Sequence, residues 1–419
     1  MKELFKAKYM LPDSEGQLIS DPAILVEDGK IIYAGPIQKG MDYDEVYDLG
    51  QSIFLPSFAN THSHVAMTLM RGIGEQDSLN SWLEKIWKVE GRLKHDELLI
   101  GNIVGISEML DSGITSFLDF YDIQPMVSAL IKLNFPIRAK LGLSFLDTVE
   151  YMKEESWKRI RDVDSYARSL AQYGIEMVLS PHSLYGVSKD LLTKIASIKG
   201  YKIQIHLSET LDESVQIKKK YGLSPVQYLN SVGLLKKGLI AAHAVHLSDE
   251  EIFQIAAASV NIAHCPVSNA RLGSGIAKIN KMDDLNVNIS LGTDGAGSSE
   301  TLDMFNEMKM SVMLSRASSA NTKINARKAL KMATANGHKA LGINAGYLKN
   351  DMLADFITVD LTKIKPSWDL ISSIVYQGGK EAVKDVVVGG KFVKENHHLI
   401  FEEILEKYET KLEDFIGVV

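Results

Sequence analysis

The stretch Leu55-Pro56-Ser57-Phe58-Ala59-Asn60-Thr61-His62-Ser63-His64 decides how the rest of this chain is interpreted. The apolar run Ile53–Phe58 predicts a buried strand, and two histidines follow it. Alternate side chains of an extended chain point the same way, so His62 and His64 share a face. Neutral imidazoles presented together suit a divalent metal such as zinc, although two hydrogen-bonded histidines at a strand end fit the same pattern.

Outward from this stretch, the chain from about residue 53 to residue 345 alternates apolar strands with helical or loop stretches. Amphipathic helices are expected at Glu97–Asp111, Trp157–Tyr173 and Asp249–Ala257. Eight such units over roughly three hundred residues predict an α/β chain with a (β/α)8 TIM barrel. A doubly wound sheet is the alternative, but it needs an early glycine-rich phosphate turn, which we do not find. The expected strands are 53–58, 114–119, 137–143, 176–180, 202–206, 239–243, 259–264 and 288–294.

The two ends of the chain predict short strands and hairpins instead. Residues 23–35 contain two strands around an Asp-Gly turn. A strand at 355–360, a hairpin with a Gly-Gly turn at 383–394 and a helix at about 401–415 follow the middle region. We therefore expect residues 1–52 together with 346–419 to form a composite β-sandwich domain, and residues 53–345 to form the catalytic barrel.

The composition is that of an ordinary globular protein, with 419 residues of which 45% are hydrophobic and 24% charged. A net charge of -7 and a pI near 5.9 argue against nucleic acid or an anionic membrane as the main partner. The single cysteine, Cys265, excludes an internal disulfide and fits a reducing compartment. With neither a signal peptide nor a bilayer-length apolar run in the sequence, we expect a cytoplasmic protein.

Chemistry-bearing side chains gather at the predicted strand ends, where the active sites of such barrels form. Seven of the eleven histidines lie there, whereas unrelated placement would scatter them. Three imidazoles and one carboxylate suit zinc or ferrous iron with an open water position, and such a metal lowers the pKa of that water towards neutrality. Glu209 follows His206 by three residues and is placed as a proton shuttle. The residues at strand ends are His62, His64, His182, His206, Glu209, His243, His246, His264 and Asp294.

Five motifs through the barrel resemble, in sequence and in order, those of the amidohydrolase superfamily in its chlorohydrolase and purine-deaminase branch. The flanking β-rich ends also fit the composite sandwich domain of that family, so the resemblance covers essentially the whole chain. The motifs are Asn60-Thr61-His62-Ser63-His64, His206-Leu207-Ser208-Glu209-Thr210, Ala242-His243-Ala244-Val245-His246-Leu247, His264-Cys265-Pro266-Val267-Ser268-Asn269 and Gly292-Thr293-Asp294-Gly295.

The resemblance implies a mechanism for hydrolysis of an aromatic C–N bond with release of ammonia. Glu209 would move a proton from water to a ring nitrogen, and His243 would orient the hydroxide or polarise the attacked centre. Binuclear relatives need a carboxylated lysine after strand four, where this chain has Ser180-Pro181-His182, so we expect one divalent metal per subunit, Zn²⁺ or alternatively Fe²⁺. Homo-oligomers are common in the family and are expected here. The implied metal ligands are His62, His64, His206 and Asp294, and Asp294 is also the implied first proton acceptor.

Within the branch, the chain resembles the S-adenosylhomocysteine/5'-methylthioadenosine/5'-deoxyadenosine deaminases, on the stretches 67–72 and 82–90. The resemblance implies that Glu90 binds the ribose hydroxyls, since a carboxylate accepts two neighbouring donors well; a solvated helix residue is the alternative. It also implies that His182 contacts the nucleoside, whereas guanine deaminases tend to carry an arginine after the corresponding proline.

One departure concerns the 5' end of the substrate. Relatives that accept S-adenosylhomocysteine hold its carboxylate with arginines after strand three, and we find no convincing pair here; Arg138, Arg159 and Arg161 are the candidates. Without them, 5'-methylthioadenosine, 5'-deoxyadenosine or adenosine is favoured. The alternative functions are a chlorohydrolase or deaminase of triazines or other N-heterocycles, guanine included, and a non-catalytic metal-binding protein.

Overall fold

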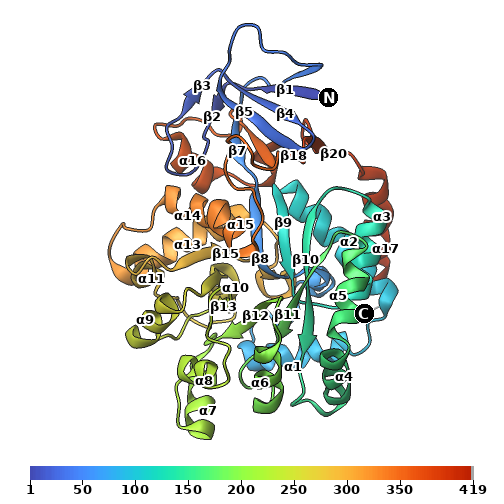
Figure 1. Cartoon of the computed structure of the whole chain (residues 1–419), viewed down its shortest axis with the longest axis vertical. Helices are drawn as coiled ribbons and strands as arrows, with labels where there is room; N and C mark the ends of the chain where they lie inside the picture. The colour runs from blue at the N-terminus through green and yellow to red at the C-terminus, as the bar shows by residue number, and fades with distance from the viewer. Residues whose placement is uncertain (417–419) are drawn as a thin grey trace.

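A parallel barrel lies beneath two packed sheets in the computed structural model, which describes residues 1–416 (Figure 1). All neighbouring barrel strands pair in parallel, in the order β15-β14-β13-β12-β11-β10-β9-β8-β16. They are β8 (Phe58–His64), β9 (Ile114–Asp119), β10 (Arg138–Phe145), β11 (Glu176–Pro181), β12 (Lys202–Leu207), β13 (Ile240–His243), β14 (Asn261–His264), β15 (Asn288–Leu291) and β16 (Asp294–Gly295).

The barrel closes because β15 and β16 are two parts of one strand: β15 pairs with β14, and β16 pairs with β8. The side chain of Asn60 contacts Thr293 twice, donating to its Oγ1 at 2.7 Å and accepting from its N–H at 3.1 Å. A Cβ at Gly292 would lie 2.9 Å from the Cβ of His62, so a residue without one is needed where these strands meet. The predicted (β/α)8 barrel is confirmed.

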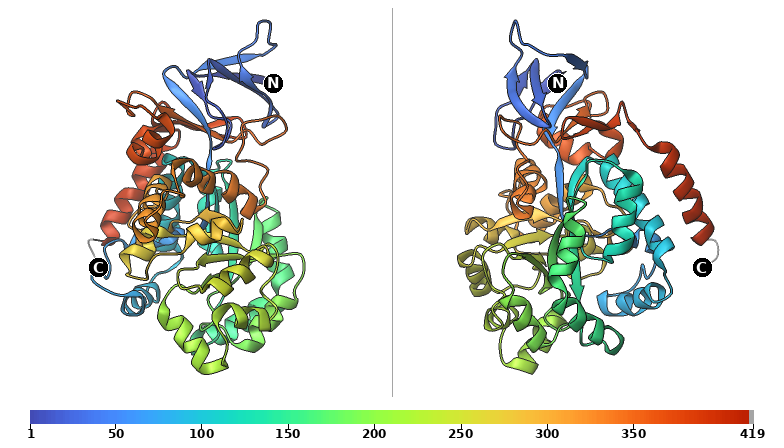
Figure 2. Two further views of the ribbon diagram at one scale, coloured as in Figure 1. Left: turned by 90° about the vertical axis from the view of Figure 1, so that its left-hand side faces the viewer. Right: turned by 45° about the vertical axis from the view of Figure 1, so that its right-hand side comes forward.

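Helices cover the outside of the barrel, as its alternating sequence pattern predicts (Figures 1 and 2). The predicted helix Asp249–Ala257 is confirmed as α9, but Trp157–Tyr173 is wrong as a single helix because the chain breaks between α4 and α5 at Asp162, whose φ and ψ of -102° and 13° leave the helical range. The covering helices are α2 (His95–Asp111), α3 (Ile123–Leu133), α4 (Glu150–Arg161), α5 (Val163–Ala171), α6 (Lys189–Ser197), α7 (Leu211–Tyr221), α8 (Pro225–Ser231), α9 (Asp249–Ala257), α11 (Ile279–Asp284), α13 (Met304–Ser319), α14 (Ala326–Ala333) and α15 (Ala335–Leu341).

Four further elements lie near the carboxyl ends of the barrel strands. They are η1 (Val65–Met70), α1 (Leu79–Glu90), α10 (Pro266–Arg271) and α12 (Ala296–Ser299). η1, α10 and α12 follow closely on β8, β14 and β16, so each extends a strand end that carries a predicted site residue, and α1 comes after η1 and a loop. In Figure 1 α1 lies at the end of the barrel opposite the two packed sheets.

The two ends of the chain build the packed sheets together. The four-stranded sheet has the order β5-β4-β1-β6, and the seven-stranded sheet β20-β19-β18-β17-β7-β2-β3. Phe5, Phe54 and Phe356 meet in the core between them. The strands are β1 (Lys2–Lys6), β2 (Tyr9–Met10), β3 (Ile19–Ser20), β4 (Pro22–Glu27), β5 (Lys30–Pro36), β6 (Glu45–Asp48), β7 (Ser52–Pro56), β17 (Phe356–Asp360), β18 (Val383–Val388), β19 (Lys391–Glu395) and β20 (His398–Leu399).

The predicted strand Ile53–Phe58 is wrong as a single barrel strand. Residues 52–56 form β7, which pairs antiparallel with β17 and parallel with β2 in the seven-stranded sheet, and the barrel strand β8 begins at Phe58. Pro56 ends the pairing of β7, since proline lacks the N–H that a ladder needs. The expected boundary between residues 52 and 53 therefore crosses the start of β7, and the division into two domains stays a prediction.

The C-terminal helix α17 (Glu402–Ile416) packs along α2 on the flank of the barrel, after α16 (Leu370–Gln377) and the β18–β20 strands (Figure 2). This helix agrees with the one expected at about 401–415. Among residues 1–416, none of the helices combines the length and the apolar character needed to cross a membrane.

Candidate active site

Four polar side chains from three distant parts of the barrel meet at the carboxyl ends of its strands. His62 and His64 end β8 and share a face, with ring centroids 5.0 Å apart. His64 Nε2 lies 3.3 Å from His206 Nε2 and 3.3 Å from Asp294 Oδ1, and His62 Nε2 lies 3.4 Å from the same oxygen. The structure brings these four side chains together, and their role as metal ligands stays a prediction.

These distances fit a tetrahedral metal site. A metal with bonds of about 2.0–2.1 Å to nitrogen and oxygen has neighbouring ligand atoms about 3.3–3.4 Å apart. Neither ring nitrogen of the buried His62 has a hydrogen-bond partner among the described residues. His206 Nδ1 lies 2.6 Å from the carbonyl oxygen of His182, to which it donates, so its Nε2 keeps the lone pair that a metal needs.

His243 also belongs to this cluster. Its imidazole, with those of His62 and His206 and the carboxylate of Asp294, offers ligand atoms that all lie within 4.8 Å of one another. His243 Nε2 faces Glu209, 3.8 Å from Oε2. The cluster therefore holds five candidate metal-binding side chains, one more than the four implied by the resemblance.

The electrostatics keep the imidazoles neutral and the carboxylate charged, which are the forms that bind metals. Burial lowers the pKa of His62, lowers that of His64 to about 3, and lowers that of His206 well below its usual value. Burial opposes ionisation of Asp294, but the neighbouring His62 and His64 outweigh it and hold its pKa well below the usual range.

Glu209 and His243, the candidates for proton transfer, both have pKa values raised above the usual ones. Burial raises the pKa of the Glu209 carboxyl above its usual value, which brings it towards the range useful for proton transfer near neutral pH. Burial disfavours the charged form of His243, but the carboxylates of Glu209 and Asp294 outweigh this and raise the pKa of the imidazole. The two groups thus form a coupled acid–base pair beside the metal-binding side chains.

Backbone strain accompanies this arrangement. His243 and Asp294 have φ values of 70° and 59°, and Ser208, between His206 and Glu209, has a φ of 50°. Non-glycine residues seldom adopt this left-handed conformation, and they do so most often at functional sites. At these points the chain turns at a strand end and presents the side chain to the mouth of the barrel.

A cavity of about 400 Å³ opens onto the cluster. His64, His206, His243, Asp294 and Glu209 line one part of it, and Glu90 and His182 line it too. Its remaining wall is largely apolar, as is usual for a small-molecule site. The apolar lining residues include Met67, Trp82, Ile86, Trp87, Phe120 and Met152.

Glu90, at the end of α1, is held by a tyrosine that the sequence analysis did not identify. Tyr121 Oη donates a hydrogen bond of 2.6 Å to Glu90 Oε1. Burial raises the pKa of the Glu90 carboxyl, and the hydrogen bond from Tyr121 opposes that shift. The only feature of the sequence that could have identified Tyr121 as a site residue is its position, two residues beyond the end of β9. The other Glu90 oxygen has no side-chain donor among the described residues.

Asp119, at the end of β9, also has a role that its sequence did not reveal. Its Oδ1 accepts a hydrogen bond of 2.8 Å from the backbone N–H of Val65, directly after His64. Asp119 is buried, and burial raises its pKa to about 7. The contact orients the chain where it leaves β8, and thereby the His64 ring.

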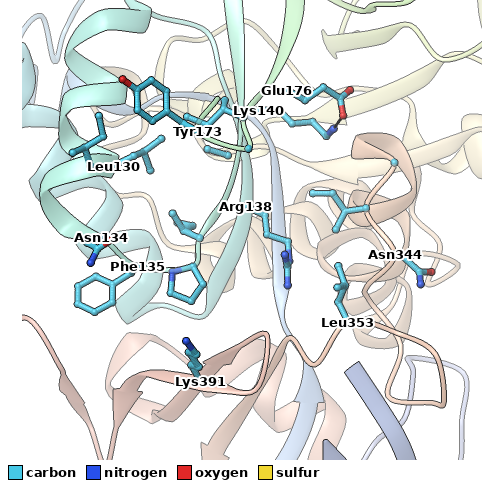
Figure 3. A pocket seen from close by; sticks show the side chains of 18 of the residues that line it. Leu130, Asn134, Phe135, Arg138, Lys140, Tyr173, Glu176, Asn344, Leu353 and Lys391 are labelled. Atoms are coloured by element: carbon cyan, nitrogen blue, oxygen red, sulfur yellow. Dashed lines mark hydrogen bonds and ion pairs between the residues drawn. The ribbon is translucent and has the colours of Figure 1, made fainter. Parts of the chain in front are cut away.

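The three candidate arginines lie in different places. Arg159 lines the cavity, where Nη1 donates to the backbone oxygen and to Oγ of Ser144 at 3.0 and 2.8 Å. Arg161 is exposed at the end of α4. Arg138 lines a different cavity, of about 960 Å³, beside the start of β10 and β11, and is bound there to the buried Asp355 (Figure 3). Only Arg159 is placed to meet a molecule in the cavity at the cluster.

Comparison with known proteins decides the family. The model of the amidohydrolase family matches residues 53–393. The chain belongs to the amidohydrolase family. This amidohydrolase is 37% identical to the 5-methylthioadenosine/S-adenosylhomocysteine deaminase of Thermococcus sibiricus, over 94% of each chain, and 34% identical to the 5'-deoxyadenosine deaminase of Methanosarcina mazei, over 99% of each.

Among solved structures, the amidohydrolase resembles an adenosine deaminase from Xanthomonas campestris with bound zinc. The TM-score is 0.91 at 27% identity, and the match covers 100% of this chain and 99% of the other. The likeness therefore extends over the barrel and both packed sheets.

Proposed function

We propose that this amidohydrolase is a metal-dependent hydrolytic deaminase that converts an adenosine-type nucleoside to its inosine analogue and ammonia. One observation carries the proposal: three of the four proposed metal ligands (all but His62), the acid–base pair and Glu90 line a single cavity of about 400 Å³ with apolar walls. That cavity offers a polar group for the ribose, apolar surface for the adenine ring and a hydrolytic centre. The names of the relatives, two of which are deaminases of 5'-substituted or 5'-deoxy adenosines, support the same substrate class.

In this proposal His62, His64, His206 and Asp294 hold the metal, because their atoms are spaced like ligands of one tetrahedral ion. A bound divalent metal supplies the acidity that allows water to act as a nucleophile near neutral pH. His243 orients that water, and Asp294 accepts its first proton. Glu209 carries one proton of that water to a ring nitrogen of the purine while the water oxygen bonds to the carbon that bears the amino group. The proton held by Asp294 then passes to the amino group, the C–N bond breaks, and ammonia leaves as the inosine analogue forms.

The proposal includes zinc as the resident metal, with ferrous iron as the alternative, and metal analysis of purified protein distinguishes them. It also includes a cytoplasmic location, which agrees with the buried free thiol of Cys265, and self-association of subunits. Light scattering on the purified protein tests the subunit number.

The deciding experiment measures turnover by zinc-loaded protein, as loss of adenine absorbance with the adenosine analogues and as release of ammonia or chloride with the other compounds. Adenosine, 5'-deoxyadenosine, 5'-methylthioadenosine and S-adenosylhomocysteine are the test substrates, and guanine and a chlorinated triazine are the counter-substrates. We expect turnover of at least one adenosine analogue and a much lower rate with both counter-substrates. Preferred turnover of guanine or the triazine would refute the nucleoside assignment, and no turnover at all would favour a metal-binding protein.

Glu90 offers a test of how the nucleoside lies in the cavity. We expect Glu90→Gln to lower kcat/KM for 5'-deoxyadenosine by roughly 10- to 100-fold, since hydrogen bonds to a charged group contribute about 1.5–3 kcal/mol. The amide oxygen can still accept from Tyr121, so the variant should fold. A 2',3'-dideoxy substrate lacks the ribose hydroxyls, so for this substrate Glu90→Gln should lower kcat/KM by less than about threefold. Equal losses with both substrates would show that Glu90 does not bind the ribose.

Arg159 makes S-adenosylhomocysteine a substrate candidate again, because its guanidinium lines the cavity and carries donors beyond the Nε and Nη1 used by Glu155 and Ser144. We expect Arg159→Gln to lower kcat/KM for S-adenosylhomocysteine about 10- to 100-fold, with little change for 5'-methylthioadenosine, which has no carboxylate. Arg161→Gln, on the same helix but exposed, is the matched control. If both substrates lose activity equally in Arg159→Gln, the arginine does not bind the carboxylate.

A further inference from the structure

The short helix α10 contacts two residues of the site with two successive side chains. Ser268 Oγ donates a hydrogen bond of 2.6 Å to Asp294 Oδ2, and Asn269 Oδ1 lies 2.9 Å from His243 Nδ1. All four side chains are buried, and Asn269 is 1% exposed. Neither Ser268 nor Asn269 lines the cavity among its described lining residues, so both act on the site from behind it.

The contact between Asn269 and His243 determines which ring nitrogen carries the proton. An amide oxygen only accepts hydrogen bonds, so a contact of 2.9 Å requires a proton on His243 Nδ1. A neutral imidazole has one ring proton, and Nε2 is therefore left with its lone pair. Nε2 is the nitrogen on the cavity side, 3.8 Å from Glu209 Oε2.

The backbone around Asn269 is held in place by contacts of α10, whereas the NH2 group of its side chain has no hydrogen-bond partner among the described residues. The Asn269 N–H donates to the Cys265 oxygen at 3.0 Å, and the Asn269 carbonyl accepts from the N–H of Ser274 at 2.8 Å. At the start of the helix, the buried carboxyl of Glu307 accepts from the Val267 N–H at 3.2 Å. The helix is thus anchored on both sides of the residue that contacts His243.

We propose that Asn269 is a positioning residue that holds His243 in the Nδ1–H tautomer, so that Nε2 accepts a hydrogen bond from the water that attacks the substrate. The opposite orientation of the amide would place its NH2 group against Nδ1 and move the ring proton to Nε2. The two arrangements differ in where one proton sits, and a direct measurement separates them. The catalytic part of the inference rests on the proposed deaminase function, whereas the tautomer does not.

The test uses zinc-loaded full-length protein with ¹⁵N-labelled histidine. Long-range ¹H–¹⁵N correlation spectra report which nitrogen of each imidazole is protonated, and the signals that vanish in His243→Gln identify His243. We expect a protonated Nδ1 in the wild type and in Asn269→Asp, because a carboxylate is also an acceptor. We expect loss of that tautomer in Asn269→Ala. Ser268→Ala, on the same helix, should leave it unchanged because Ser268 contacts Asp294.

Kinetics with 5'-deoxyadenosine give the second readout. We expect Asn269→Ala to lower kcat about 10- to 100-fold with little change in KM, and Asn269→Asp to recover most of kcat. Thermal unfolding checks that each variant folds. A protonated Nε2 in the wild type, or an unchanged spectrum of His243 in Asn269→Ala, would overturn the proposal. If the tautomer follows Asn269 but no adenosine analogue is deaminated, the proposed function fails and the assignment of the proton stands.

Discussion

Replacing Glu209 by glutamine is expected to lower kcat by about 100- to 10,000-fold, the usual contribution of a positioned proton-transfer group. Glutamine has the same shape but cannot carry a proton. Glu209 is buried, lines the cavity and faces His243 across 3.8 Å, and burial raises the pKa of its carboxyl above the usual value. The measurement is the steady-state rate of loss of adenine absorbance at saturating 5'-deoxyadenosine.

Metal analysis and the Glu213→Gln variant provide the controls for this experiment. Metal content should be unchanged in Glu209→Gln, because Glu209 is not among the proposed ligands. Glu213 has another buried carboxyl group, which accepts a hydrogen bond of 3.1 Å from the backbone N–H of Glu209. An amide oxygen can still accept that hydrogen bond, so we expect kcat of Glu213→Gln to fall by less than about tenfold. Equal rates in the wild type and Glu209→Gln would contradict the role of Glu209 as the proton carrier.

The second large effect concerns His62. We expect His62→Ala to weaken metal affinity by more than about 100-fold, since even removing a group that only orients a ligand costs about 10- to 100-fold. The buried His62 has no hydrogen-bond partner for either ring nitrogen among the described residues, and its Nε2 lies 3.4 Å from Asp294 Oδ1. Activity should fall with the metal content, measured by elemental analysis after dialysis against a weak chelator.

His264→Gln is the matched control for the metal experiment. His264 is another buried histidine at a strand end, on β14, but it lies outside the metal-binding cluster. Its variant should keep one metal per chain under the same dialysis. Loss of metal from both variants would indicate a general loss of structure, and retention of metal in His62→Ala would exclude His62 as a ligand.

Which side chains gather at the mouth of the barrel was largely predictable from the sequence, because their placement depends on local rules. The two-residue period of a strand places His62 and His64 on one face, and the tendency of barrel sites to form at strand ends singles out His206, Glu209, His243 and Asp294. The structure brings these residues together as expected. The supporting residues were harder to identify: Ser268 and Asn269 stood inside a motif already noted, yet nothing local states which side chain they contact.

The sequence alone determined the alternation of strands and helices, the residues at each strand end and, through the family motifs, the class of chemistry. Only the tertiary structure decided that residues 52–56 belong to the seven-stranded sheet, that Asn269 contacts His243, and that Arg159 rather than Arg138 lines the cavity. Local periodicity sets the direction of a side chain relative to its own strand or helix. Contacts between residues far apart in the chain depend on strand register, barrel closure and the turns between elements, which emerge only when the whole chain packs.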